Sequence, residues 1–168
     1  LALEGPAPAD GTAVGAAPAA PTGRAAWLQL TDGVAIDGAT ELVTTDDGVI
    51  VGDLATALAS HERLVREHLY SLVDFSDKPG ARNGAGWDAG LFVYVPEGVR
   101  LELPIEARNW VTGAHGEVFG RTLVIAERGS HVTVIDRYGS PDLQGPVSVS
   151  SVVELFVAED AEVEHVSV

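Results

Sequence analysis

Three histidines lie among the short apolar runs in the second half of the chain, at His115, His131 and His165. Imidazole binds zinc and iron readily, so a metal site is the first chemistry to consider. Aligning the repeats described below predicts that His131 lies opposite Val163 and His165 opposite Thr133, on one shared face. This two-residue offset is too long for ligands that must lie ~2.0–2.1 Å from one ion. We therefore expect structural or solvent-facing histidines. The alternative, that His131 binds iron, predicts less bound iron in His131→Ala.

Other arrangements that could carry chemistry are incomplete. His115 in Gly-Ala-His-Gly-Glu is similar to half of a cupin metal motif, but that motif needs a second histidine where this chain has Glu117. The serines of residues 147–152 lack the Gly-x-Ser-x-Gly elbow that exposes a nucleophile. The glycines at 84, 86 and 90 lack the Lys-Ser/Thr of a phosphate loop. The sequence therefore predicts no catalytic, cofactor-binding or metal-binding residue.

Three glutamates, Glu97, Glu127 and Glu159, recur at similar positions in successive segments. Carboxylates stacked ~5 Å apart would raise one another's pKa if they stood alone. Arg100 and Arg128 are close in sequence, however, and the glutamates fall at expected corners between strands. We therefore predict a solvated acidic edge, and no acid or base catalysis.

These glutamates belong to a repeat that indicates the fold. Residues 91–105, 123–136 and 155–168 each read as an apolar strand, a corner and an alternating strand. Val95-Pro96-Glu97 lies 30 positions before Ile125-Ala126-Glu127, which lies 32 before Val157-Ala158-Glu159. Sandwich, barrel and parallel β-helix are all possible, but repeats of this length are typical of stacked architectures. We predict a mainly β fold, a parallel β-helix of single-stranded coils.

The rest of the chain divides into three expected parts. Residues 1–23 are rich in Ala, Pro and Gly and are interpreted as a linker or loop. Residues 24–80 form a short α/β segment with one helix, at about 53–74, capped by Asp53 and ended by Lys78-Pro79-Gly80. Residues 81–168 contain the first coils of the β-helix core. Because an alternating strand pattern continues to the last residue, we expect a core truncated at its C-terminus.

Composition excludes several classes of function. The chain of 168 residues has a net charge of −15, which disfavours binding to nucleic acid or acidic lipid. It has no cysteine, so disulfides and thiolate ligands are absent. No apolar run approaches the ~20 residues that span a bilayer. We expect a cytoplasmic protein that binds neither membrane nor nucleic acid.

Four segments together resemble a known family. They are Gly90–Glu106 (GLFVYVPEGVRLELPIE), Arg121–Thr133 (RTLVIAERGSHVT), Val153–Val168 (VELFVAEDAEVEHVSV) and, upstream, Asp53–Val73. In order and spacing they are similar to the core subunits of the SUF iron–sulfur cluster assembly machinery, SufB and SufD, and more to SufD. The connection at residues 78–90 departs from the Asn-rich segment of that family. The resemblance covers roughly residues 46–168 and implies that the β-helix is right-handed.

The resemblance also implies a function. The parent protein would be a non-catalytic scaffold that pairs with a paralogous SufB-like subunit and a SufC-like ATPase. The cluster would be handled by the parent complex, with no cofactor bound by this part, because the family's docking and cluster-related residues have no matching positions here. Two alternatives remain: a β-helix enzyme acting on carbohydrate or transferring acyl groups, and a β-helix that polymerises as a structural element.

Overall fold

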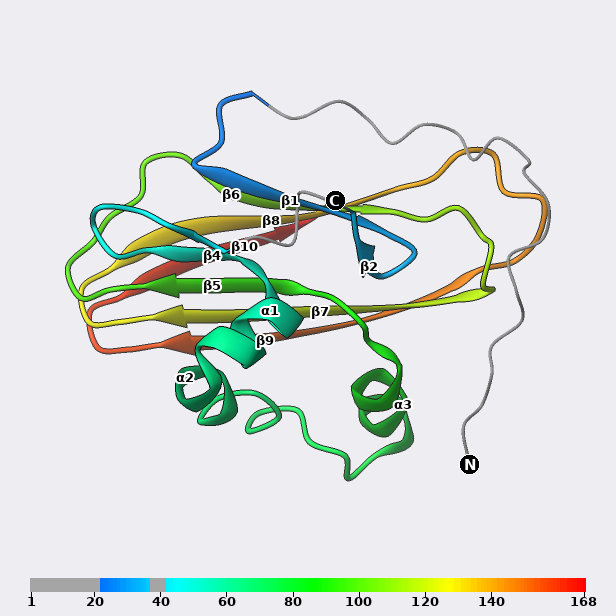
Figure 1. Ribbon diagram of the computed structural model, residues 1–168, viewed down its shortest axis with the longest axis horizontal. Helices are drawn as coiled ribbons and strands as arrows, with labels where there is room; N and C mark the ends of the chain where they lie inside the picture. Colours follow the sequence, from blue (N-terminus) through cyan, green and yellow to red (C-terminus); the bar gives the residue numbers. More distant parts are fainter. Residues whose placement is uncertain (1–21, 37–41) are drawn as a thin grey trace.

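The computed structural model describes residues 22–36 and 42–168, which form two β-sheets and three helices (Figure 1). The strands are β1 Ala26–Thr31, β2 Val34–Ala35, β3 Val43–Thr44, β4 Ile50–Asp53, β5 Leu91–Val95, β6 Ile105–Trp110, β7 Glu117–Ala126, β8 His131–Gly139, β9 Ser148–Val157 and β10 Glu162–Ser167. The helices are α1 Leu54–Ser60, α2 Glu62–Arg66 and α3 Lys78–Gly86. The prediction of a mainly β fold is confirmed. The linker predicted for residues 1–23 lies almost entirely outside the described residues.

The two sheets are mixed. Sheet A has the order β10-β8-β6-β1-β2, and sheet B has the order β3-β4-β5-β7-β9. The pairs β1–β6, β6–β8 and β8–β10 in sheet A are parallel, as are β5–β7 and β7–β9 in sheet B. Antiparallel pairing joins β1 to β2, β3 to β4 and β4 to β5. The repeated segments are therefore parallel neighbours, as the sequence predicts, and the N-terminal strands extend both sheets.

From β5 onward the chain alternates between the sheets. Strands β5, β7 and β9 belong to sheet B, whereas β6, β8 and β10, which follow them in turn, belong to sheet A. Each repeat therefore contributes one strand to each sheet and pairs with the repeat before it. Figure 1 shows the corners between β5 and β6, β7 and β8, and β9 and β10 gathered at one end of the sheets.

The register of the repeats differs from the predicted one. Val95 pairs with Ala126 and Ala126 with Val157, a spacing of 31 and 31 where the sequence alignment gave 30 and 32. Gly98, Gly129 and Asp160 consequently share one corner position, and each has a positive φ (74°, 68° and 59°). That conformation costs glycine little, so glycine occupies the position twice. The alignment placed Ala161 at this position, one residue too far along the chain.

The main core lies between the two sheets. Sheet B contributes Val93 and Val124, and sheet A contributes Leu28, Ile105 and Val134, all fully or almost fully buried. A second apolar cluster lies on the outer face of sheet B, where Phe92, Leu123 and Ile125 pack against Leu54 and Val65 of the helices. Sheet B therefore buries both faces and its strands read as continuous apolar runs, as is usual for buried parallel strands.

The single helix predicted at 53–74 is wrong in its extent. Asp53 does cap a helix, its carboxylate accepting the Thr56 N–H at 2.9 Å. The helix is interrupted at His61, however, and α2 ends at Arg66. Farther on, Tyr70 adopts a positive φ of 68° that no α-helix contains. Val65 and Leu69 are buried against sheet B, whereas Leu72, a later residue of the apolar pattern, is 59% exposed.

The connection predicted after residue 75 contains a third helix. Lys78-Pro79-Gly80, interpreted as a helix stop, instead begins α3, with proline in the first turn and the Asp77 carboxylate accepting the Gly80 N–H at 2.6 Å. Proline fits the first turn because the missing N–H has no partner there. Since α3 crosses residue 80, the N-terminal segment carries three helices and not one.

Candidate functional site

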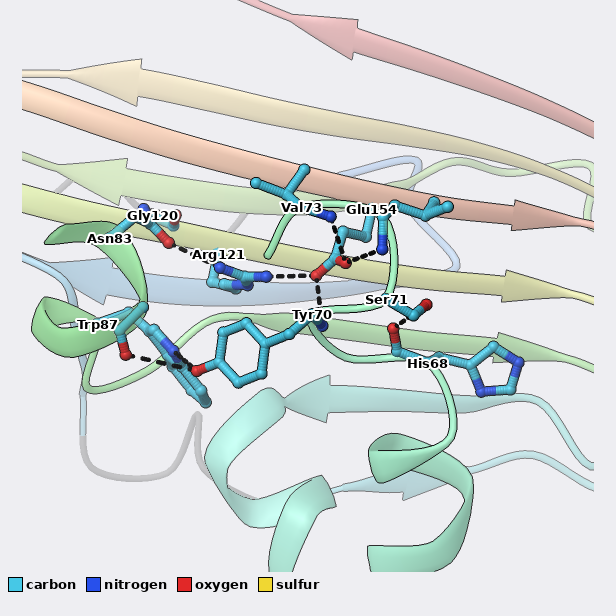
Figure 2. A network of polar contacts seen from close by, with 11 residues as sticks. His68, Tyr70, Ser71, Val73, Asn83, Trp87, Gly120, Arg121 and Glu154 are labelled. Carbon is cyan, nitrogen blue, oxygen red and sulfur yellow. Dashed lines mark hydrogen bonds and ion pairs between the residues drawn. The ribbon is translucent and has the colours of Figure 1, made fainter. Parts of the chain in front are cut away.

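A fully buried ion pair lies on the outer face of sheet B. Arg121 of β7 and Glu154 of β9 contact each other through Nη2 and Oε2, and both side chains are fully buried (Figure 2). Removing two charges from water is costly unless further hydrogen bonds satisfy them. The surroundings of this pair therefore decide whether it stabilises the fold.

Glu154 satisfies that condition by holding the segment after α2. Its Oε2 accepts the backbone N–H of Tyr70 at 3.2 Å, and its Oε1 accepts those of Leu72 and Val73 at 3.1 and 3.2 Å. Together with Arg121, four donors surround one carboxylate. The positive φ of Tyr70 turns the chain so that these N–H groups converge. Glu154 thus ties residues 70–73 to the sheet.

Arg121 is held from the other side by α3. The Asn83 Oδ1 accepts from Arg121 Nη1 at 3.0 Å, and Asn83 Nδ2 donates to the carbonyls of Gly120 and Ser150, each at 3.0 Å. The Tyr70 ring lies 4.4 Å from the guanidinium carbon in a cation–π contact. Trp87 Nε1 donates to the Tyr70 hydroxyl at 2.7 Å. We call these residues the Arg121–Glu154 network; its donor set fastens the helical layer to sheet B.

The outer face of sheet A carries a second cluster. Glu106 of β6 is buried, and its carboxylate contacts Nε of Arg24 at 2.5 Å, of Arg137 at 3.0 Å and of Arg108 at 3.4 Å. Burial alone would raise the pKa of Glu106, but hydrogen bonds from Arg24 and Arg137 outweigh it and hold that pKa below its usual value. Arg24 and Arg137 share one anion here, so these three residues keep a positive excess.

The histidines lie apart from one another. His131 pairs with Glu162 and not with Val163, and His165 pairs with Val134 and not with Thr133. They therefore lie on opposite faces of sheet A, contrary to the shared face predicted from the repeat. His131 Nδ1 lies 3.1 Å from Glu162, while His165 Nε2 lies 2.8 Å from Asp136 inside the molecule.

Asp136 and His165 form a small polar group between the sheets. Buried Asp136 also accepts a hydrogen bond from the Thr122 hydroxyl at 3.1 Å, which joins β7, β8 and β10. His115 is exposed in the turn before β7, and Glu117, at the second cupin position, pairs with Arg82 at 2.5 Å. Within residues 22–36 and 42–168, no three His, Cys, Asp or Glu side chains gather closely enough to hold a metal ion.

The repeated glutamates do not form the expected ladder. Glu97 and Glu159 share one register position, but Arg128 lies between them, because both spacings are 31. Arg128 pairs with Glu97, and both side chains are more than half exposed. Glu127 is displaced by one residue from the other two. The prediction of a solvated edge is confirmed, whereas the alignment of all three carboxylates is wrong.

The serines and glycines considered above have packing contacts. The Ser151 hydroxyl accepts from Tyr138 at 3.0 Å, and the Ser150 carbonyl accepts from Asn83. A side chain at Gly90 would collide with the backbone carbonyl of Arg121. Gly90 therefore allows the close approach of the segment before β5 to β7, which is a structural reason for that glycine.

Comparison with known proteins identifies the family. Residues 109–168 match the model described as SUF system FeS cluster assembly, SufBD core domain. Proteins named iron–sulfur cluster assembly SufBD family protein are similar over 124 residues, 73% of this chain: those of Staphylococcus epidermidis, Staphylococcus haemolyticus and Staphylococcus aureus are 35%, 34% and 33% identical. The chain belongs to the SufBD family. It spans about 27% of the length of those relatives.

The match to the SufBD core model covers only part of this chain. Residues 109–168 contain β7 to β10 and the end of β6, so Arg121 and Glu154 lie inside the match while Asn83 and Tyr70 precede it. In the described residues, no helix combines the length and apolar character needed to cross a bilayer.

Sequence reasoning missed both charged clusters. The sequence did contain a signal of the first cluster, because Arg121 and Glu154 are single charged residues inside otherwise apolar runs. A charged side chain in a buried strand needs a partner. The sequence did not reveal that these two residues pair. They lie 33 residues apart, whereas the strands pair residues that are 31 apart, so the contact is diagonal.

Proposed function

We propose that the chain is part of a SufD-like, non-catalytic scaffold subunit for iron–sulfur cluster assembly. The observation that carries this proposal is the SufBD core match over residues 109–168, which includes the parallel strands β7 to β10. A rigid stack suits a scaffold because each repeat contacts its neighbours along an extended surface. The cluster is then cargo of the parent complex and is not held by these residues.

The architecture proposed for the subunit is a right-handed parallel β-helix. Parallel pairing within β5–β7–β9 and β6–β8–β10, with the chain alternating between two sheets, supports it. Crossovers between parallel strands are right-handed in about 98% of cases, which supports the hand. The antiparallel strands β2, β3 and β4 would then belong to the lead-in that precedes the stacked coils.

The proposed partners are a SufB-like paralogue and a SufC-like ATPase in the cytoplasm. A net charge of −15 argues against nucleic acid and acidic membranes as partners. In the part of the chain described, β9 and β10 are terminal strands of their sheets, and the edge of a sheet accepts further strands. ATP hydrolysis would be supplied by the partner, which leaves this subunit without a catalytic role.

The test is co-expression of the protein with a SufB-like subunit and a SufC-like ATPase, followed by affinity capture and size-exclusion chromatography. We expect one complex in which all three co-elute, with ATPase activity that depends on the SufC-like subunit. Failure of the three to co-elute contradicts the scaffold role. Turnover of a carbohydrate or acyl substrate without partners would favour an enzyme, and filaments seen by light scattering would favour a polymer.

A further inference from the structure

The outer face of sheet A has a hollow beside the arginine cluster of Arg24, Arg108 and Arg137. Gln29, Arg108 and Arg137 lie in register across β1, β6 and β8, and Thr31, Trp110 and Gly139 form the next row. A hollow of about 50 Å³ is lined by residues of both rows, among them Gln29, Arg137 and Trp110. A Cβ atom at position 139 would lie 3.0 Å from the Trp110 ring. Glycine at this position therefore leaves room for the Trp110 ring beside the hollow.

The hollow is basic in an acidic protein. Arg24 and Arg137 both contact Glu106, which leaves one positive charge beyond neutrality among these three residues, in a chain whose net charge is −15. The Arg137 side chain is 40% exposed, and Nε makes its ion pair with Glu106. Within residues 22–36 and 42–168 its two terminal nitrogens make no ion pair, and they can donate in parallel to a carboxylate, the geometry that arginine favours.

A buried acceptor in the hollow lacks a donor. Gln29 is 5% exposed, and its Nε2 donates to the carbonyls of Leu30 and Arg108 at 3.3 and 3.2 Å, which fixes the direction of the amide. Its Oε1 has no hydrogen-bond partner in the described part of the chain. A buried acceptor without a donor costs about 1–3 kcal/mol. The site therefore calls for an N–H or O–H group next to an anion.

We propose that this hollow binds an extended acidic segment of a partner protein, with one Asp or Glu carboxylate on Arg137 and a neighbouring peptide N–H on Gln29. A hollow of about 50 Å³ is small, which favours a single side-chain carboxylate over a nucleotide. Trp27, 42% exposed on the same face, and Trp110 offer apolar contact for the rest of the segment. The dianion of a phosphate monoester would satisfy Arg137 but has no donor for Gln29.

This surface goes beyond the scaffold role and does not depend on it, because it rests on the face of sheet A alone. The probe is a fluorescein-labelled Gly-Glu repeat peptide, with a Gly-Gln repeat of equal length as control. Fluorescence anisotropy at low ionic strength measures binding to the 168-residue chain. We expect the Glu peptide to bind, the Gln peptide to bind at least about tenfold more weakly, and salt to weaken the difference.

The variant is Arg137→Gln. Its control is Arg128→Gln, because Arg128 is an exposed arginine that pairs with one glutamate, Glu97, at the corner between β7 and β8. We expect Arg137→Gln to weaken binding of the Glu peptide about tenfold and Arg128→Gln to change it less than about twofold. Equal losses in both variants would show attraction to the chain in general and overturn the proposal.

A second measurement does not depend on any variant folding. In ¹H–¹⁵N spectra of the wild-type chain, the Trp110 indole and Gln29 side-chain signals should shift saturably with the Glu peptide and stay in place with the Gln peptide. Shifts confined to other residues, or no shift at all, would reject this site. Inorganic phosphate that competes as strongly as the peptide would reduce it to a simple anion site and also overturn the proposal.

Discussion

The outer faces of the two sheets use the same pair of residue types in opposite ways. On sheet B, one arginine meets one glutamate, both fully buried beneath the helical layer, and backbone N–H groups complete the shell around the carboxylate. On sheet A, three arginines meet one glutamate, and their side chains are between 15% and 40% exposed. The first arrangement is closed, and the second retains charge toward solvent.

This difference separates stabilisation from recognition. A closed pair needs hydrogen bonds to offset its desolvation. Glu154 accepts four donors, and the buried Arg121 Nε has no partner in the described residues, so the Arg121–Glu154 network fastens parts of the same chain and is closed to solvent. An excess of half-buried guanidinium groups is already partly desolvated and still has donors to spare, which suits binding to a carboxylate from outside. Stoichiometry and access to water, and not residue type, therefore distinguish the two faces.

The largest effect is expected from breaking the closed pair. Glu154→Gln leaves Arg121 buried without its anion, and we expect the free energy of unfolding to fall by about 3–5 kcal/mol. Urea unfolding followed by circular dichroism measures the loss. Residues 70–73 should gain faster amide hydrogen exchange than the strands, because Glu154 holds them.

A double variant sharpens the same test. Arg121→Met with Glu154→Leu removes both charges and keeps apolar bulk, so it should be more stable than Glu154→Gln alone. If the double variant were the less stable of the two, the hydrogen bonds to residues 70–73 would outweigh the cost of the uncompensated Arg121 charge.

A smaller and pH-dependent effect is expected on sheet A. Glu106→Gln removes the anion shared by three arginines, and we expect a loss of about 1–3 kcal/mol at pH 7, smaller than on sheet B because water screens the arginines. The folded pKa of Glu106 lies below the usual 4.5, since hydrogen bonds from Arg24 and Arg137 outweigh burial. Its stabilisation is therefore complete above pH 4.5 and is lost as pH falls through the folded pKa.

The measurement is urea unfolding of wild type and Glu106→Gln from pH 7 to pH 3. Their difference in unfolding free energy should stay constant down to about pH 5 and shrink below it. Other carboxylates titrate in both proteins and cancel in the difference. A difference that grows on acidification would mean that Glu106 has a raised pKa in the folded protein, contrary to its three arginine contacts.

Tyr70→Phe tests the edge of the closed network. Its hydroxyl accepts from Trp87 Nε1 at 2.7 Å, so the variant leaves this indole N–H without its partner. We expect a loss of about 1 kcal/mol, measured by urea unfolding, because the cation–π contact with Arg121 is retained. Tyr94→Phe, on the neighbouring β5, is the control, and a loss there of equal size would contradict the role of the Trp87 hydrogen bond.

Strand order and parallel stacking were predictable from the sequence because the repeats carry their apolar pattern and corners in the same order. The register was not predictable. Residue type aligns Glu97, Glu127 and Glu159. The backbone conformation instead aligns Gly98, Gly129 and Asp160. A positive φ at Asp160 has no strong signal in sequence, since aspartate only tolerates that region.

The two charged clusters were beyond sequence reasoning for a related reason. Each joins segments far apart in the chain: Glu154 contacts Tyr70, 84 residues away, and Glu106 contacts Arg24, 82 away. Short-range spacing cannot reveal such contacts. The helices were misjudged because Leu69 is buried against sheet B although it follows the end of α2, so the apolar periodicity extended past the helix.

The smallest effect is expected at the exposed corner that contains Arg128. This corner adds a third charged group to the comparison of the two sheets. Arg128 and Glu97 form a pair with the one-to-one stoichiometry of sheet B, but their side chains are 61% and 62% exposed. Arg128→Gln should lower the free energy of unfolding by less than about 0.5 kcal/mol, because water solvates both partners once the pair is broken. Urea unfolding measures the change, and added salt should make it smaller still, because salt screens an exposed pair. A loss approaching that of Glu154→Gln would show that one-to-one pairing stabilises this chain whatever its burial, and the distinction between the two faces would then rest on stoichiometry alone.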